Sequence, residues 1–206
     1  MANKTQLFKL RALQGRIEES DYELISDNIV SYLKEIHSKE VFENDWEDEY
    51  IGLMNLAVFN HGLIKKSGLK DYILVDFIEK NKFIIKDRKT SKTLEKHSLM
   101  DLVFDDKFGI VKTKTTNGDY VVDFYTLNVI AIEHPKLAKM IVSKYFSGGV
   151  NRKFFRLLSL YTAVYCLNLI VKIDQYPQCN EYYQNRLDHI FDFYEDFTVE
   201  IPTWFK

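Results

Sequence analysis

The side chains that could carry out chemistry do not stand in a recognised catalytic or metal-binding pattern. No two histidines are spaced as His-x-x-x-His, and Cys166 and Cys179 form no Cys-x-x-Cys pair. Such spacings are typical of zinc sites. The five histidines are His37, His61, His97, His134 and His189. We therefore predict no metal site and no cofactor.

Nucleophilic and phosphate-binding motifs are absent from the sequence as well. A serine nucleophile needs an activating base, and no Gly-x-Ser-x-Gly elbow is present. A phosphate cradle needs a glycine-rich turn before a helix. The glycine pair Gly148-Gly149 has no Lys-Ser or Lys-Thr after it, so we interpret it as a turn between two helices.

A basic segment runs from Lys80 to Lys114. If its cations shared one face, Lys86, Arg88 and Lys89 would contact nucleic-acid phosphates. Seven acidic residues between Asp76 and Asp106 interrupt the segment. This interruption favours a solvated loop over a nucleic-acid-binding module, and both interpretations stay open.

Two segments resemble the C-terminal lobe of aminoglycoside and choline phosphotransferases. Residues 27–37 (DNIVSYLKEIH) look like the helix that opens that lobe, and residues 121–124 (VVDF) resemble its second metal-binding segment. The resemblance implies that Asp101 orients the acceptor hydroxyl while Asp106 and Asp123 hold Mg²⁺. Leu99 stands where the family has histidine, and Asp106 stands where it has asparagine.

Composition sets the broad class of the protein. The chain has 206 residues, 46% of them hydrophobic, and a net charge of −2. That length favours one domain over residues 1–206, and the charge gives no general attraction to nucleic acid or acidic lipid. The N-terminus shows no signal-peptide pattern, and two cysteines fit reduced thiols in the cytoplasm. The apolar run at 157–171 is shorter than a membrane span needs, so we expect a buried helix.

Helical periodicity dominates the chain. Ser20 and Glu23 form a capping-box pattern, and apolar residues at three- and four-residue spacing follow it. The long run at 152–173 is apolar all round, which predicts the central helix of the fold. The predicted helices cover residues 21–37, 45–66, 135–147, 152–173 and 181–195.

A smaller β portion is predicted at about residues 72–126. Residues 72–79 and 82–86 are rich in β-branched and aromatic types, which predicts two strands, although a helix over 69–79 is an alternative. Asn117-Gly118 is the preferred centre of a two-residue hairpin turn. Folding the chain there places Lys112 opposite Asp123. The fold class is therefore α+β, mainly α.

The aromatic content points to a contact surface. Thirteen tyrosines exceed what a core easily hides, and tyrosine is enriched at interfaces. We expect a non-enzymatic protein that binds other chains, its own or different ones, as an assembly or structural subunit of a larger complex such as a phage particle. The expected contact residues are Tyr182, Tyr194, Trp204 and Phe205. A phosphotransferase-like protein and a nucleic-acid-binding module are the alternatives.

Overall fold

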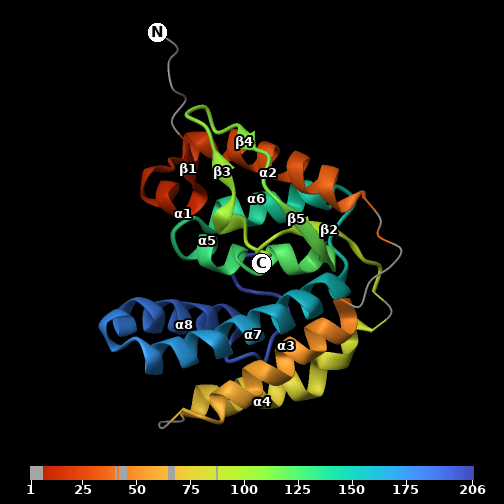
Figure 1. Ribbon diagram of the computed structural model, residues 1–206. Coiled ribbons are helices and arrows are strands. Elements are labelled where there is room, and N and C mark those ends of the chain that lie inside the picture. The colour runs from red at the N-terminus through yellow and green to blue at the C-terminus, as the bar shows by residue number, and fades with distance from the viewer. Residues whose placement is uncertain (1–6, 40, 42–45, 65–67, 87) are drawn as a thin grey trace. The chain divides into compact units, whose positions relative to one another are not determined.

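The computed structural model describes residues 7–39, 41, 46–64, 68–86 and 88–206 (Figure 1). The chain forms two compact units, each built from two separate stretches of sequence. Unit 1 comprises Met1–Phe42 and Lys89–Val150, and unit 2 comprises Glu43–Arg88 and Asn151–Lys206. The single domain over residues 1–206 stays a prediction.

Unit 1 packs helices against two small antiparallel sheets. One sheet has the strand order β1-β3-β4, and the other pairs β2 with β5. The helix α2 packs against α6, and α5 also contacts α6. Its strands are β1 (Phe8–Lys9), β2 (Ser91–Leu94), β3 (Val103–Phe104), β4 (Ile110–Val111) and β5 (Thr115–Gly118). Its α-helices are α1 (Leu10–Leu13), α2 (Tyr22–His37), α5 (Leu127–Glu133) and α6 (Pro135–Tyr145), and 3-10 helices span Gln14–Arg16, Glu19–Asp21, Leu99–Asp101 and Tyr120–Phe124.

The chain leaves unit 1 and returns to it at adjacent points. The backbone N–H of Val41 donates to the carbonyl of Thr90 at 3.3 Å, and that of Lys92 donates to the carbonyl of Lys39 at 3.0 Å. The segment between them contributes α3 and α4 to unit 2. Unit 2 is therefore half inserted into the sequence of unit 1.

Both helices predicted for unit 1 are confirmed within two residues at each end, but the predicted cap of α2 is wrong. A 3-10 turn, Glu19–Asp21, precedes α2. The Asp21 carboxylate accepts a hydrogen bond from the Glu18 backbone N–H at 3.0 Å. A capping box of Glu18 and Asp21 therefore stands where Ser20 and Glu23 were expected.

The predicted hairpin at Asn117-Gly118 is wrong. Both residues lie in β5, where Asn117 is opposite Lys92 and Gly118 is opposite Ser91, and neither has the positive φ that the turn requires. The next residues form a 3-10 helix because the Asp119 carboxylate accepts the Val121 N–H at 3.1 Å. Lys112 accordingly lies 3.8 Å from Glu35 in an exposed ion pair and does not pair with Asp123.

Unit 2 is all helical in the residues that the structure describes. Its central helix, α7, packs against α3, α4 and α8 (Figure 1). Among the described residues, α7 alone is long and apolar enough to cross a membrane, but 83% of its most apolar stretch is buried, as a core helix should be. The helices are α3 (Trp46–His61), α4 (Leu69–Asn81), α7 (Arg152–Gln175) and α8 (Asn180–Tyr194), and 3-10 helices span Lys82–Ile85 and Pro177–Cys179.

Three of the predicted helices lie in unit 2. The helices predicted at 152–173 and 181–195 are confirmed within two residues, and α3 covers most of the one predicted at 45–66. Residues 45, 65 and 66 of that prediction lie outside the described residues. Both cysteines are free thiols, as expected.

The strands predicted at 72–79 and 82–86 are wrong. Residues 69–81 form α4 and residues 82–85 a 3-10 helix. The buried residues of α4 are Asp71, Leu74 and Ile78, which is helical spacing. At the N-terminus, the Asp71 carboxylate accepts the Gly68 backbone N–H at 2.9 Å. The β-branched composition misled because a short apolar run of this kind is compatible with a helix as well as with a strand. The fold class itself, α+β and mainly α, is confirmed.

Candidate functional site

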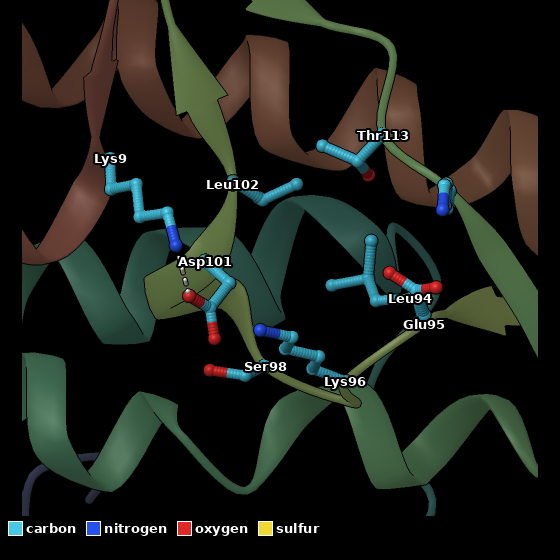
Figure 2. A pocket seen from close by; sticks show the side chains of 9 residues that line it. Lys9, Leu94, Glu95, Lys96, Ser98, Asp101, Leu102 and Thr113 are labelled. Atoms are coloured by element: carbon cyan, nitrogen blue, oxygen red, sulfur yellow. Dashed lines mark hydrogen bonds and ion pairs between the residues drawn. The ribbon is translucent and has the colours of Figure 1, made fainter.

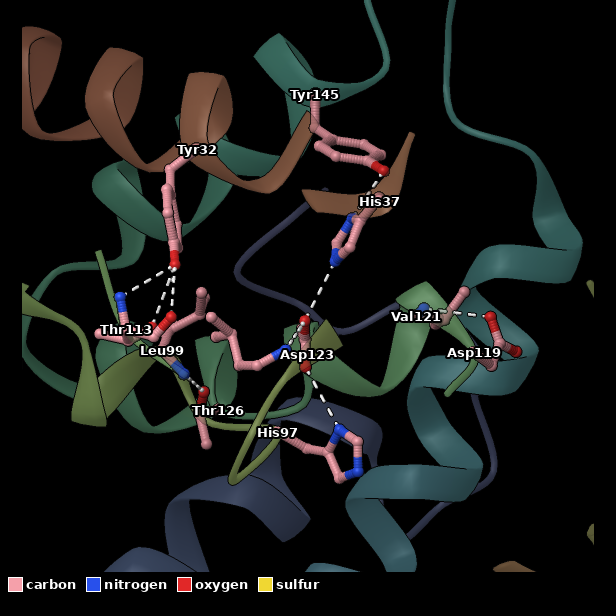
Figure 3. A network of polar contacts seen from close by, with 11 residues as sticks. Tyr32, His37, His97, Leu99, Thr113, Asp119, Val121, Asp123, Thr126 and Tyr145 are labelled. Carbon is pink, nitrogen blue, oxygen red and sulfur yellow. Dashed lines mark hydrogen bonds and ion pairs between the residues drawn. The ribbon is translucent and has the colours of Figure 1, made fainter. Parts of the chain in front are cut away.

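A network of buried polar groups in unit 1 is built around the fully buried carboxylate of Asp123 (Figure 3). Its Oδ2 accepts a hydrogen bond from the backbone N–H of Leu94 at 2.9 Å and lies 3.0 Å from Nε2 of His37. The 3-10 helix supplies the aspartate, β2 supplies the amide and the end of α2 supplies the imidazole. Three elements that are far apart in the sequence therefore meet at this carboxylate.

The network continues from His37 to Tyr145. Nδ1 of His37 lies 2.9 Å from the Tyr145 hydroxyl. Burial raises the pKa of the Tyr145 phenol, and Tyr120, Asp123 and Asp119 raise it further. A carboxylate can only accept, so Nε2 of His37 donates to Asp123, and the second ring nitrogen of His37 shares a hydrogen bond with the Tyr145 hydroxyl.

His97 approaches the same carboxylate from the other side. Its Nδ1 lies 3.4 Å from Oδ1 of Asp123, slightly too long for a directed hydrogen bond, and both atoms are buried without a hydrogen-bond partner. The backbone of His97 has a left-handed φ of 47°, which for a non-glycine residue costs energy. Asp123 therefore faces a ring nitrogen of His97 as well as one of His37.

A polar cavity of about 190 Å³ opens beside the turn that carries His97 (Figure 2). Its lining combines three lysines, two carboxylates and two hydroxyls. The residues are Lys9, Leu94, Glu95, Lys96, Ser98, Asp101, Leu102, Thr113 and Lys114. The residues on either side of His97 line the cavity and His97 itself does not. The cavity and the Asp123 network therefore both lie at the end of β2, but neither His97 nor Asp123 lines the cavity.

The three aspartates of the phosphotransferase resemblance lie in different environments. Asp101 lines the cavity and pairs with Lys9 at 3.2 Å and with Arg11. Asp106 is exposed in the turn between β3 and β4, whereas Asp123 is buried. Among the described residues, no group of three or more His, Cys, Asp or Glu side chains is arranged to hold a metal ion. The roles that the resemblance implies stay predictions.

The residues predicted to contact nucleic acid belong to both units. Lys86 is exposed in unit 2, where its ammonium lies 5.0 Å from the centre of the Phe83 ring. Arg88 is half-buried at the end of the same stretch, and Lys89 is exposed at the start of the second stretch of unit 1. Their part in binding nucleic acid stays a prediction.

Most of the residues predicted to contact a protein partner help to build unit 2. Tyr194 and Trp204 are buried, and Phe205 is half-buried with its ring 4.8 Å from that of Phe155. The chain after α8 turns back through left-handed residues, which stacks Phe197 on Tyr194 at 5.1 Å. Of the four, only Tyr182 is exposed enough to meet a partner.

The helix α3 carries an exposed apolar face that was not predicted from the sequence. Leu53, Leu56, Phe59 and Leu63 lie on it or directly after the helix, and they are 48%, 51%, 63% and 68% exposed. The opposite face, which buries Trp46, Tyr50, Met54 and Ala57, packs on α7. The sequence already contained an indication of this face, because residues 50–59 carry no charged side chain. Such a helix is apolar on more faces than one core can cover.

No protein-family model matches the chain, and no curated protein matches it.

Proposed function

We propose that this protein works by binding another protein chain through the apolar face of α3, and that the bound chain is a second copy of itself. The observation that carries the proposal is the row of exposed side chains Leu53, Leu56, Phe59 and Leu63. Contiguous exposed apolar residues on a globular protein mark interaction surfaces.

The distribution of apolar surface supports unit 2 as the binding unit. Of the twelve large hydrophobic residues that are exposed among those described, nine belong to unit 2. Burying a leucine or phenylalanine that is half exposed stabilises a complex by about 1 kcal/mol. Four such residues per chain therefore supply several kcal/mol toward the cost of association.

Charge along α3 supports self-association. Its first turn carries Glu47, Asp48 and Glu49, and Lys65 and Lys66 follow the helix in the sequence. In an antiparallel pair, the acidic start of one helix lies toward the end of the other that these lysines follow. A two-fold axis makes this complementarity reciprocal.

The experiment is light scattering on the full chain during size-exclusion chromatography over a range of concentrations. The proposal predicts a species of twice the chain mass of 24.4 kDa. Replacing both Leu56 and Phe59 by glutamate should return the protein to a monomer without changing its circular dichroism. Leu24→Glu is the matched control, because Leu24 is 48% exposed on α2 of unit 1.

A wild-type protein that is monomeric at every concentration would contradict the choice of a second copy. Dissociation of the dimer by Leu24→Glu but not by the α3 variant would contradict the choice of surface. A structural or assembly role inside the cell, including the phage particle considered above, is the broader setting that we propose for such a dimer.

A further inference from the structure

The cavity beside Asp101 gathers more cations than its carboxylates neutralise (Figure 2). Lys9, Lys96 and Lys114 line it together with Glu95 and Asp101. Arg11 adds a fourth cation, because its guanidinium pairs with the Asp101 carboxylate. A concave site lined by an excess of one sign of charge concentrates ions of the opposite sign.

Asp101 pairs with two of these cations, Lys9 and Arg11, and does not fill the site. Its carboxylate accepts a hydrogen bond from the Lys9 ammonium at 3.2 Å, and its side chain remains 19% exposed. In Figure 2 the Lys9 and Lys96 side chains both extend toward Asp101 from opposite sides. The carboxylate thus holds the Lys9 and Arg11 side chains near one another, which lowers the conformational entropy lost when an anion binds beside them.

Hydroxyl groups and size narrow the class of ligand. Ser98 and Thr113 add hydroxyls to the lining, and that of Thr113 also shares a hydrogen bond with the Tyr32 hydroxyl at 3.1 Å. Hydroxyls and ammonium groups are among the usual side-chain donors to phosphate oxygens. A volume of about 190 Å³ is below the usual range for drug-sized ligands, roughly 300–1,000 Å³. It suits a compact oxyanion.

We propose that this cavity of unit 1 binds the phosphate group of a small molecule, with Lys96 and Lys9 as its principal cationic contacts. The group is inorganic phosphate or the phosphoryl end of a small metabolite. The site is independent of the α3 surface, because every residue that lines it belongs to unit 1.

The test is calorimetric titration of the full chain with inorganic phosphate, and separately with pyrophosphate and glycerol phosphate, in a phosphate-free buffer. The proposal predicts saturable binding of at least one of these ligands. Lys96→Gln should weaken it about tenfold or more, since a charge-assisted hydrogen bond is lost. Lys9→Gln should act in the same direction. If glycerol phosphate bound more tightly than inorganic phosphate, the natural ligand would be a phosphorylated metabolite.

Lys112→Gln is the matched control. Lys112 lies in the same unit, its side chain is 83% exposed, and it does not line the cavity. Its replacement should leave the affinity for phosphate unchanged. Because Lys96 is exposed, the variant should keep the wild-type circular dichroism and midpoint of thermal unfolding.

Two results would overturn the proposal. One is the absence of saturable binding of all three ligands. The other is an equal loss of phosphate affinity in Lys96→Gln and Lys112→Gln, which would show that the anion responds to the general positive charge of the surface and not to this cavity. The proposal would also be overturned if a single-stranded oligonucleotide bound more tightly than any of the small phosphates and both variants weakened its binding equally. The basic residues would then bind the backbone of a nucleic acid.

Discussion

The two units differ in where their polar and apolar side chains lie. Of the thirteen buried polar or charged residues described, ten lie in unit 1 and three in unit 2. Unit 2 instead buries the apolar helix α7 and exposes nine of the twelve large hydrophobic residues found at the surface. Unit 1 thus has polar groups inside and few large apolar ones outside, whereas unit 2 shows the reverse.

The difference shows where each unit can act. The hydrogen bonds of the buried Asp123 carboxylate connect three elements of unit 1, and charged side chains of the same unit line a cavity. Unit 2 builds its core around α7, and α3 keeps a row of exposed apolar residues, which is the surface that we propose for binding a second chain. Ligand chemistry therefore belongs to unit 1 in our interpretation, and chain association belongs to unit 2.

The largest effect is expected from Asp123→Ala. Removing the carboxylate leaves the buried N–H groups of His37 and Leu94 without an acceptor, which should lower the free energy of unfolding by about 2–5 kcal/mol. Both tryptophans, Trp46 and Trp204, lie in unit 2. In urea titrations, circular dichroism should therefore shift while tryptophan fluorescence changes much less.

The control for Asp123→Ala is Asp106→Ala, an exposed aspartate in the same unit. It should change the free energy of unfolding by less than about 0.5 kcal/mol. If Asp123→Ala lowered the free energy of unfolding by less than about 1 kcal/mol, the scale of an exposed contact, the Asp123 network would not be what stabilises unit 1. The contrast between the two units would then be wrong.

An intermediate effect is expected from Tyr145→Phe. At neutral pH, losing its hydrogen bond to His37 should cost about 1 kcal/mol. Because the pKa of Tyr145 is raised in the folded state, its contribution is complete below the ordinary tyrosine value of about 10 and is lost as the pH rises above it. Urea titrations from pH 8 to 11 should thus show a shallower decline in stability for the variant than for wild type.

Tyr176→Phe provides the control for this alkaline effect, because that phenol is exposed in unit 2. Its stability should follow the wild-type pH profile. Identical alkaline slopes for wild type and Tyr145→Phe would remove Tyr145 as the source of the decline.

The smallest effect is expected from Asp188→Asn in unit 2. Partial burial raises the pKa of Asp188, but hydrogen bonds from Lys70 and Gln184 lower it by more, so the net pKa lies below its ordinary value. Its contribution is present above about pH 4 and is lost as the pH falls further. Because the side chain is 48% exposed, the loss should stay below about 1 kcal/mol.

The salt dependence of stability is a further test of the Asp188 ion pair. Added NaCl screens an exposed ion pair, so the difference between Asp188→Asn and wild type should shrink at high ionic strength. Asp192→Asn, an exposed change on the same helix, is the control. A loss above about 2 kcal/mol, the range of buried pairs, would show that unit 2 also depends on polar contacts.

Sequence periodicity was enough for α2, α3, α6, α7 and α8, because each buries one face or all faces at helical spacing, but residues of α4 were predicted as strands. The helix α7, apolar all round, was found within two residues. The hairpin at Asn117-Gly118 failed because β5 finds its partner in β2, which lies more than twenty residues earlier in the chain. A local turn preference could not reveal that long-range pairing.

The candidate sites were harder to predict for the same reason. Asp101 was singled out, but the cavity depends on residues from Lys9 to Lys114 that the fold brings together. His37 and His97 have no informative spacing, and only the fold places them on either side of Asp123. The face of α3 was visible as a helix with too few charges, although which side remained exposed depended on α7.

The interleaved order of the two units has a consequence for synthesis on the ribosome. Unit 1 has its complete sequence once Val150 has been made, and the adjacent positions of Val41 and Thr90 allow it to close around the inserted segment. The inserted helices α3 and α4 must wait for α7, with the faces that it will cover still bare. A nascent chain that stalls in that interval exposes apolar surface on both helices, and premature aggregation would begin there.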